Sequence, residues 1–438
     1  MLSTTAIAGI GLVLFLVLIF LGVPIYICMG GVGLLGCLAI THNFGAVSTF
    51  LSDAFIKTFT TYTVSVAPMF MLMGEIASES GIGSNLFKSV KTVLGRQKGA
   101  LASAVQVACA LFGAICGAAV ATCTLMSRVA CPEMTKARYS DELNTGAVSA
   151  GSVLATLIPP SLPLITYGSS VQESIGKLFF GGIFVGITLM VIFIIVVQIW
   201  CLIKPEAGPA GEKSTAKEKI KALKEGNVIE VVLVFGFSML GMFTGWFTPT
   251  EAGAVGTILM LIVVIVNKRF SFKMLGRALM HTMMTAGMMY CLLAGTNIFG
   301  KFFTLARLSN TIGTFVAGLD VSKYAIIAVI TLIFMILGCF MDAMAAVLVT
   351  APILLPILQS FGYNAVWYGV YAVMITGLGA ITPPVGMACF ISSGITKVPV
   401  DRVFKGSAPF ILAYLLMAAL MAVFPQLAMW LPNLVMGG

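Results

Sequence analysis

The sequence predicts an all-α protein that crosses a membrane many times, and three observations lead to this prediction. The chain has 438 residues, of which 59% are hydrophobic and 9% charged, whereas a soluble domain carries about 25% charged residues. Two Pro-Pro pairs, Pro159-Pro160 and Pro383-Pro384, interrupt long apolar stretches 224 residues apart. Residues around them recur at the same spacing without a gap, as in the pairs Ala119 and Ala343, Ala121 and Ala345, Pro132 and Pro356, Ser169 and Ser393, and Phe180 and Phe404.

Apolar stretches follow one another along the whole chain. A membrane-spanning helix needs roughly 17–25 residues, and the stretches cover residues 5–28, 30–44, 62–80, 101–131, 144–172, 178–203, 226–247, 251–267, 281–300, 324–356, 366–394 and 406–432. The first stretch is long and has no Lys or Arg before it, so we predict a true span and not a cleaved signal peptide. The hydrophilic segment 204–225 is predicted to be a cytoplasmic linker between a first repeat, residues 1–203, and a second repeat, residues 226–438.

Two stretches are predicted to be re-entrant hairpins, each with two short helices that meet at a tip of small residues. The stretch 101–131 contains Gly113 and Cys116 near its middle, and the stretch 324–356 contains Gly338. The alternative is one tilted helix, but about 31 residues exceed the length that a bilayer requires.

Two other stretches, 144–172 and 366–394, are predicted to be helices broken at the Pro-Pro pairs. Proline cannot continue a helix, and freed carbonyl groups persist inside a membrane only where protein or a water-filled cavity satisfies them. Broken helices at corresponding positions of two repeats indicate the binding site of a transporter.

The loop charges predict that the two repeats have opposite orientations. The first hairpin is flanked by six basic residues, and the second by Lys323 alone: Lys88, Lys91, Arg96, Lys98, Lys136 and Arg138 surround the first. Because cytoplasmic loops are rich in Lys and Arg, the first hairpin should enter from the cytoplasm and the second from the opposite face. Basic segments 204–225, 268–277 and 396–405 then lie in the cytoplasm, and both termini lie outside.

Hairpin tips that face broken helices offer two kinds of ligand. Helix N-termini suit an anion, and unwound carbonyl groups suit Na⁺. Hydroxyl groups lie near both breaks, from Ser152, Thr156 and Ser161 at the first and from Thr376 and Thr382 at the second. We therefore expect the substrate between the two hairpin tips.

Asp342 is the one carboxylate within the second hairpin. A charge in an apolar segment is costly and is therefore a functional candidate. The alternative is that Asp342 caps the second helix of its hairpin, and the sequence leaves both roles open.

Other classes of function find little support. The ten cysteines form no CxxC or Cys/His ligand pattern, so we expect no disulfide and no transition-metal site. No Walker A, G-x-S-x-G or H-E-x-x-H motif occurs, so we expect a transporter and not an enzyme, driven by an ion gradient or a partner. A channel would need a continuous polar pore, and an intramembrane enzyme would need catalytic groups at the breaks, where only Asp342 lies nearby. The net charge of +9 comes from basic residues in short loops, which suits lipid headgroups and not nucleic acid.

Six segments resemble the large membrane (M) subunit of tripartite ATP-independent periplasmic (TRAP) transporters. They are 68–75 (PMFMLMGE), 157–161 (LIPPS), 248–252 (TPTEA), 338–342 (GCFMD), 350–356 (TAPILLP) and 379–386 (GAITPPVG), in order along nearly the whole chain. A different inverted-repeat dicarboxylate family would lack the Thr-Pro-Thr-Glu-Ala and Gly-Glu signatures.

The resemblance implies an elevator-type secondary transporter of the bacterial inner membrane. Its transport domain would contain the hairpins and broken helices, and the other spans would form a scaffold. A small four-helix membrane subunit (Q type) and a periplasmic solute-binding protein (P type) would be its partners. It would use a Na⁺ gradient to import a small organic acid anion, a carboxylate or a sulfonate, with no cofactor apart from Na⁺ as the coupling ion.

The resemblance also implies site residues, most of which would act through backbone carbonyl groups. The first Na⁺ site would use Gly113, Ala155, Ile158 and Pro160. The second would use Gly338, Gly379, Thr382 and Val385. The substrate pocket would include Cys116, Thr156, Ser161, Asn297, Asp342 and Ala388.

This chain departs from the family pattern at three places. The first hairpin tip is usually serine-rich, a Gly is usual at the position of Ala155, and an Asn is usual at the position of Ala388. Carbonyl ligation tolerates the first two changes. The change at Ala388 is expected to reshape the substrate pocket. The substrate of the commonest family members should therefore not be assigned to this chain.

Overall fold

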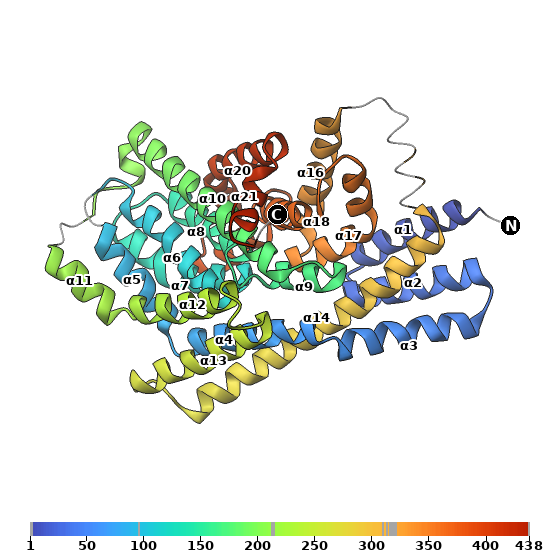
Figure 1. Ribbon diagram of the computed structural model, residues 1–438. Helices are drawn as coiled ribbons and strands as arrows, with labels where there is room; N and C mark the ends of the chain where they lie inside the picture. The colour runs from blue at the N-terminus through green and yellow to red at the C-terminus, as the bar shows by residue number, and fades with distance from the viewer. Residues whose placement is uncertain are drawn as a thin grey trace.

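The computed structural model is all-helical over the residues that it describes, which are 3–94, 97–211, 215–308, 311, 314 and 322–436. The helices, shown in Figure 1, are α1 (Thr4–Phe20), α2 (Ile25–Thr41), α3 (Phe44–Thr60), α4 (Val66–Glu79), α5 (Ile82–Leu94), α6 (Ala100–Cys116), α7 (Ala119–Lys136), α8 (Asp141–Val153), α9 (Leu162–Val171), α10 (Ile175–Ile203), α11 (Ala216–Glu225), α12 (Val228–Phe243), α13 (Pro249–Val266), α14 (Phe272–Leu305), α16 (Lys323–Phe340), α17 (Ala343–Ser360), α18 (Ala365–Gly379), α19 (Met387–Thr396), α20 (Val400–Val423) and α21 (Gln426–Met436). The predicted fold class is confirmed.

Both predicted hairpins are present. In the first, α6 and α7 pack against each other and join at Gly117, whose φ of +63° is accessible to glycine without strain. In the second, α16 and α17 join at Met341 and Asp342. The second helices of the two hairpins begin at Ala119 and Ala343, which have the 224-residue spacing of the sequence pattern.

Both predicted broken helices are also present. Helix α8 ends in a short 3-10 turn, Leu154–Thr156, and α9 begins after the first Pro-Pro pair at Leu162. Helix α18 ends at Gly379, and α19 begins after the second pair at Met387. The two breaks differ in burial, because Pro159 and Pro160 are buried whereas Pro383 and Pro384 are exposed.

Helices of the two halves pack against each other at the centre of the molecule. Helix α8 packs along α20, α7 packs on α19, and α9 packs on α17. At the crossing of α8 with α20, an added Cβ at Gly146 would overlap the backbone of Gly406. Backbones approach this closely in membranes where glycines face each other. Each broken helix is therefore supported by elements from the other half, although the repeat boundaries remain a prediction.

Long peripheral helices surround this centre. Helix α14 has 34 residues and runs diagonally across the lower part of Figure 1, in contact with α2, α3 and α4. Helices α3 and α5 were not among the predicted apolar stretches, because Asp53, Lys57, Lys88 and Lys91 reduce their hydropathy. The predicted stretch 406–432 is also two helices, α20 and α21, which are separated at Phe424 and Pro425.

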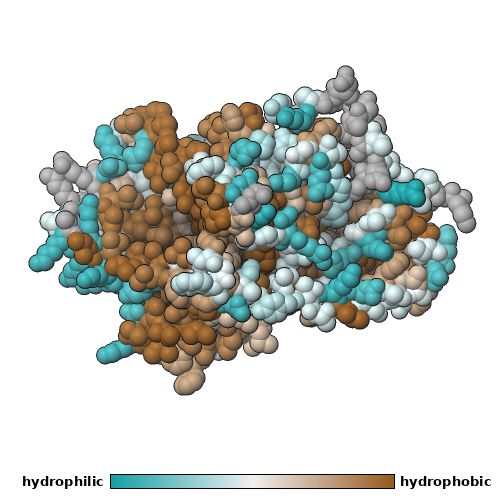
Figure 2. Space-filling model, viewed as in Figure 1, coloured by the Kyte–Doolittle hydropathy of each residue, from teal (hydrophilic) through white to brown (hydrophobic). Residues whose placement is uncertain are grey.

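Apolar side chains cover the outer faces of several helices. Figure 2 shows a broad hydrophobic surface on the left of the molecule, where α10, α12 and α13 lie. Helix α10 exposes Ile187, Val191, Ile195 and Ile199 in one stripe of four-residue spacing, as a lipid-facing helix would. Within the described residues six helices are long and apolar enough to cross a membrane, or seven if the bent pair α11 and α12 is one span.

The linker is tied to the first half by Tyr139, which lies between α7 and α8. Its hydroxyl donates to the carbonyl oxygen of Pro209 and accepts from the backbone N–H of Leu101, both at 3.1 Å. Burial raises the pKa of Tyr139 to about 12, so the hydroxyl stays protonated and can donate at neutral pH. Helix α11 begins with a capping box of Thr215 and Glu218.

Replacing Tyr139 with phenylalanine is expected to destabilise the junction of linker and first hairpin by about 1–3 kcal/mol, because it leaves the buried N–H of Leu101 without its acceptor and removes the bond to Pro209. The measurement is the rate of proteolytic cleavage within 204–211, which should increase in the Y139F variant. The variant Tyr62→Phe changes an exposed tyrosine and serves as the control. Equal cleavage rates for Y139F and the wild type would contradict the prediction.

Candidate functional site

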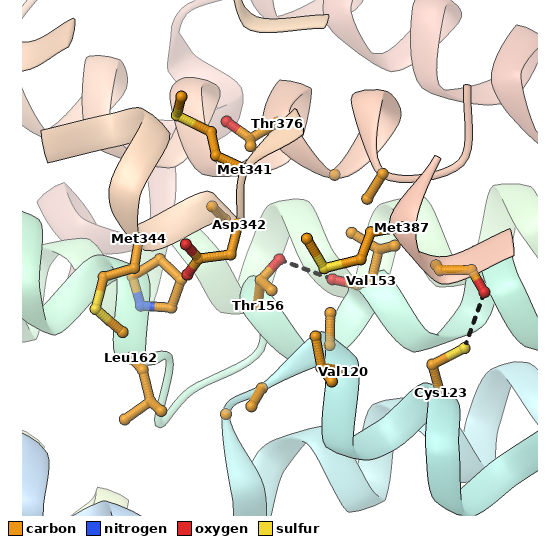
Figure 3. A pocket seen from close by; sticks show the side chains of 18 of the residues that line it. Val120, Cys123, Val153, Thr156, Leu162, Met341, Asp342, Met344, Thr376 and Met387 are labelled. Carbon is orange, nitrogen blue, oxygen red and sulfur yellow. Dashed lines mark hydrogen bonds between the residues drawn. The ribbon is translucent and has the colours of Figure 1, made fainter. Parts of the chain in front are cut away.

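The N-termini of four half-helices meet around one cavity at the centre of the molecule. They belong to α7 and α17 of the hairpins and to α9 and α19 of the broken helices. The space between these helix ends, open solvent included, is about 670 Å³. Figure 3 shows its walls, which come from Gly117, Ala118, Ala119, Val120, Cys123, Val153, Thr156, Leu162, Pro163, Met341, Asp342, Ala343, Met344, Thr376, Gly377, Ala380, Met387, Ala388 and Ile391.

Two of these helix N-termini lack a capping hydrogen bond from a side chain, and their N-cap residues are Ala118 of α7 and Gly386 of α19. At α9 Ser161 accepts from the N–H of Leu164. At α17 the carboxyl group of Asp342 accepts from the backbone N–H groups of Met344 and Ala345. Uncapped N-termini leave backbone N–H groups available and carry partial positive charge. The cavity therefore suits a small anion even though, of the residues that the structure describes, no Lys, Arg or His lines it.

The hydroxyl groups in the cavity wall donate to their own helices. Thr156 donates to the carbonyl oxygen of Val153 at 2.8 Å, and Thr376 donates to that of Ala372 at 2.7 Å. These are the local bonds that Ser and Thr commonly form in helices. Their oxygen atoms remain available as acceptors. The thiol of Cys123 donates to the carbonyl oxygen of Ala388 at 3.3 Å, which ties the first hairpin to α19.

The four residues predicted for the first Na⁺ site belong to two segments that touch. An added Cβ at Gly113 would lie 2.5 Å from the Cα of Ala155, and one at Gly117 would overlap the carbonyl oxygen of Pro160. Pro159 and Pro160 have no N–H, so they cannot donate to the carbonyls of Ala155 and Thr156 four residues earlier. The carbonyl of Thr156 accepts instead from Ser161.

The residues predicted for the second Na⁺ site are brought together in the same way. An added Cβ at Gly379 would lie 2.5 Å from the carbonyl oxygen of Met335 and 2.6 Å from the Cα of Gly338. The hydroxyl of Thr382 donates to the carbonyl oxygen of Leu378 at 2.7 Å, so its oxygen is still a possible ligand. Val385 is half-buried in the same loop.

Three of the predicted pocket residues do not line the cavity. Asn297 donates to the hydroxyl of Thr58 at 3.1 Å and joins α14 to α3. The thiol of Cys116 pairs with the hydroxyl of Thr122 at 3.2 Å inside its hairpin, and Ser161 is fully buried as the cap of α9. Thr156, Asp342 and Ala388 do line the cavity.

The sequence analysis missed most of the apolar wall. Leu162, Met344 and Met387 lie in the first turns of the half-helices that follow a tip or a break, and Ile391 lies one turn further along α19. Their position directly after a hairpin tip or a helix break could have identified them. The start of a helix at such a place faces the site on which the helix N-termini converge.

A membrane protein with two hairpins, two broken helices and one cavity at their junction has the form of a transporter. The family model of the tripartite ATP-independent periplasmic transporter, DctM component, matches residues 12–427. This chain therefore belongs to that family, and it is the large membrane subunit of a TRAP transporter. It is accordingly a multi-pass bacterial membrane protein.

Two relatives cover most of the chain. A sialic acid TRAP transporter large permease protein of Vibrio cholerae is 28% identical over 423 residues, which are 96% of this chain and 97% of that protein. A C4-dicarboxylate TRAP transporter large permease protein of Pseudomonas aeruginosa is 28% identical over 384 residues, 86% and 88% of the two chains. The crystal structure of the YdaH transporter of Alcanivorax borkumensis shares the fold, with a TM-score of 0.65 and 15% identity over 89% of this chain and 90% of that one.

Proposed function

We propose that this subunit imports a small organic acid anion, a carboxylate or a sulfonate, together with Na⁺. The observation that carries the proposal is the convergence of four half-helix N-termini on one cavity, because such termini attract anions. The names of the relatives agree with this class of substrate, since one transports sialic acid and another C4-dicarboxylates. A small four-helix membrane subunit and a periplasmic binding protein that delivers the substrate complete the transporter.

Na⁺ occupies the two places where a hairpin touches a broken helix. Gly113 with Ala155, Ile158 and Pro160 forms the first site, and Gly338 with Gly379, Thr382 and Val385 forms the second. The close backbone contacts at Gly113 and Gly379 support this assignment, because unwound carbonyl groups are the usual Na⁺ ligands in broken-helix transporters.

Transport follows an elevator mechanism in the bacterial inner membrane, with both termini on the periplasmic side. The hairpins, the broken helices and the cavity between them move as one transport domain. The long helix α14 and the helices α2 and α4, which both pack on it, belong to the scaffold. The interleaved contacts of α7 with α19 and of α9 with α17 support a single moving unit.

The test is uptake into proteoliposomes that contain the large subunit, the small subunit and the binding protein. The labelled substrate is the acid that most stabilises the cognate binding protein in a thermal-shift screen of carboxylates and sulfonates. An inward Na⁺ gradient is expected to drive uptake above equilibrium, and replacing Na⁺ with K⁺ should reduce uptake to the level of protein-free vesicles.

Two controls define the result. In the first, omission of the binding protein should also abolish uptake. In the second, a K⁺ gradient with the ionophore valinomycin sets the same membrane potential without Na⁺. Uptake at the same rate in K⁺ as in Na⁺ would refute the coupling, and uptake without the binding protein would refute the delivery step.

A further inference from the structure

A second pocket lies between α7 and α19, one helical turn beyond the central cavity. Its space, open solvent included, is about 780 Å³, and its walls include Ser127, Arg128, Cys131 and Pro132 of α7 and Ile395 and Thr396 of α19. On the same two helices the central cavity is lined by Cys123 and Ile391, four residues before Ser127 and Ile395. Because residues four apart lie one above the other on a helix, both spaces follow one seam between α7 and α19.

A layer of side chains that is partly polar separates the two spaces. The thiol of Cys123 donates to the carbonyl oxygen of Ala388 at 3.3 Å, a bond drawn in Figure 3, and lies 3.9 Å from the hydroxyl of Ser127. The backbone N–H of Ser392 approaches the same thiol. The Ser392 hydroxyl is buried, and no group of the described residues bonds to it. Buried hydroxyl groups usually have a partner, often water, so this layer suits an oxygen atom of water or of a passing acid.

Arg128 is the charged residue among the described residues that line the second pocket. It is exposed. In the part of the chain that the structure describes, no carboxylate lies within ion-pair distance of it, whereas Arg277 pairs with Glu79 and Arg402 with Asp141. A guanidinium group holds the oxygen atoms of an acid group through two parallel N–H bonds. The pocket therefore offers an unpaired cation of the kind that recognises acids.

Pro132 adds an acceptor to the same pocket. It lies inside α7 and has no N–H, so the carbonyl group of Arg128, four residues earlier, cannot receive the usual helical bond from it. An arginine that only extended its charge to the membrane surface would not require a pocket wall of this kind. The guanidinium group and the carbonyl group of one residue can together bind an acid group and the water that accompanies it.

We propose that this pocket is a second anion site, on the cytoplasmic side of the central cavity, where Arg128 binds the acid group of the transported anion after it leaves the helix N-termini. The acid reaches the pocket along the seam when the bond between Cys123 and Ala388 opens. Lys136 and Arg138 at the end of α7 place this side in the cytoplasm by the distribution of basic residues. The inference rests on the proposed function and adds a site to it.

A cysteine in the wall of the pocket tests the inference with probes of known charge. Thr396→Cys, at a half-buried position, is prepared in the complex of large and small subunits in lipid nanodiscs, in K⁺ buffer of low ionic strength without Na⁺. Peptide mass spectrometry distinguishes this cysteine from the native ones. The probes are two methanethiosulfonate reagents, one with a sulfonate group and one with a trimethylammonium group.

The ratio of the two labelling rates reports the charge of the pocket. One charge a few ångströms away changes each rate several-fold in opposite directions, so the ratio of anionic to cationic labelling should fall about tenfold when Arg128→Gln is added. Arg128→Lys keeps the charge and should keep most of the ratio. Because each ratio is measured within one variant, partial loss of folded protein does not affect it.

Competition separates an acid site from a surface that is only positive. Acetate and methanesulfonate should slow the reaction of Thr396→Cys with the neutral reagent N-ethylmaleimide several-fold relative to the same concentration of chloride, because the guanidinium fork binds two oxygen atoms. This slowing should be lost in Arg128→Gln. Ser271→Cys, at an exposed position before α14, is the control, and its labelling should respond neither to Arg128→Gln nor to the acids.

An unchanged ratio in Arg128→Gln, or slowing by acetate and methanesulfonate that persists in this variant, would overturn the inference. Equal effects of the acids and chloride on Thr396→Cys, or no labelling of this cysteine by any of the three reagents, would do so as well. The assay contains no Na⁺ and measures no transport. Its outcome is therefore separate from the proposed function, which fails if uptake in proteoliposomes does not respond to Na⁺.

Discussion

Replacing Gly379 with alanine is expected to reduce Na⁺-driven uptake by about 100-fold. The new Cβ would lie 2.5 Å from the carbonyl oxygen of Met335 and 2.6–2.7 Å from backbone atoms of Gly338. Backbone atoms cannot move aside as a flexible side chain can, so the second hairpin must shift away from the broken helix. A displacement of about 1 Å at a site of this kind can cost about 100-fold in rate, and the proposed second Na⁺ site spans this contact.

The control for this variant is Gly394→Ala, in the neighbouring helix α19. No heavy atom lies within 4 Å of the Cβ that alanine would add there, and alanine is the better helix former. Uptake by Gly394→Ala should equal that of the wild type. The Na⁺ concentration for half-maximal uptake is measured for both variants, and a wild-type rate and Na⁺ response for Gly379→Ala would show that the contact does not hold the ion.

Replacing Gly146 with leucine is expected to prevent the centre of the protein from assembling. An added Cβ at this position would overlap the carbonyl group of Gly406 and would lie 2.8 Å from its Cα. Overpacking usually costs about 1–3 kcal/mol, and a leucine between two backbones in contact should cost about 3 kcal/mol or more. The expected result is loss of the monodisperse peak in fluorescence-detected size-exclusion chromatography, or a much lower midpoint of thermal unfolding.

Gly287→Leu provides the same change of residue on a free helix face. Gly287 lies in α14, and an added Cβ would meet nothing within 4 Å, so this variant should elute and unfold like the wild type. Similar behaviour of the two leucine variants would show that the crossing of α8 and α20 is not essential to the fold.

The interruptions of the helices could be predicted from the sequence because proline and glycine act locally. The Pro-Pro pairs remove backbone donors wherever they occur, and the 224-residue spacing identified which segments correspond. Two helices were not predicted, α3 and α5, since charged residues such as Asp53 and Lys88 lower the hydropathy on which the prediction of spans depends. A count of apolar residues does not detect a helix whose charged residues face away from the core.

The cavity could be predicted only in part. Thr156, Asp342 and Ala388 lie beside a tip or a break, and the structure places all three in its wall. Asn297 was assigned by resemblance, but its partner Thr58 lies 239 residues away in the sequence, and no local pattern indicates this contact. The positions of Met344 and Ile391 likewise depend on how helices from the two halves cross, which is a property of tertiary packing.

The packing of helices from one half against helices of the other has a consequence for how such a chain can evolve. The crossing of α8 with α20 has a counterpart at the 224-residue spacing, where α10 lies against α18 and Gly181 approaches Val370. Two separate copies of one half would have to keep both crossings identical, because each mutation would appear in both. Once the copies are fused, each crossing can change alone. In the fused chain one Pro-Pro break is buried and the other is exposed. A symmetric dimer of identical halves could not have this difference between its two breaks.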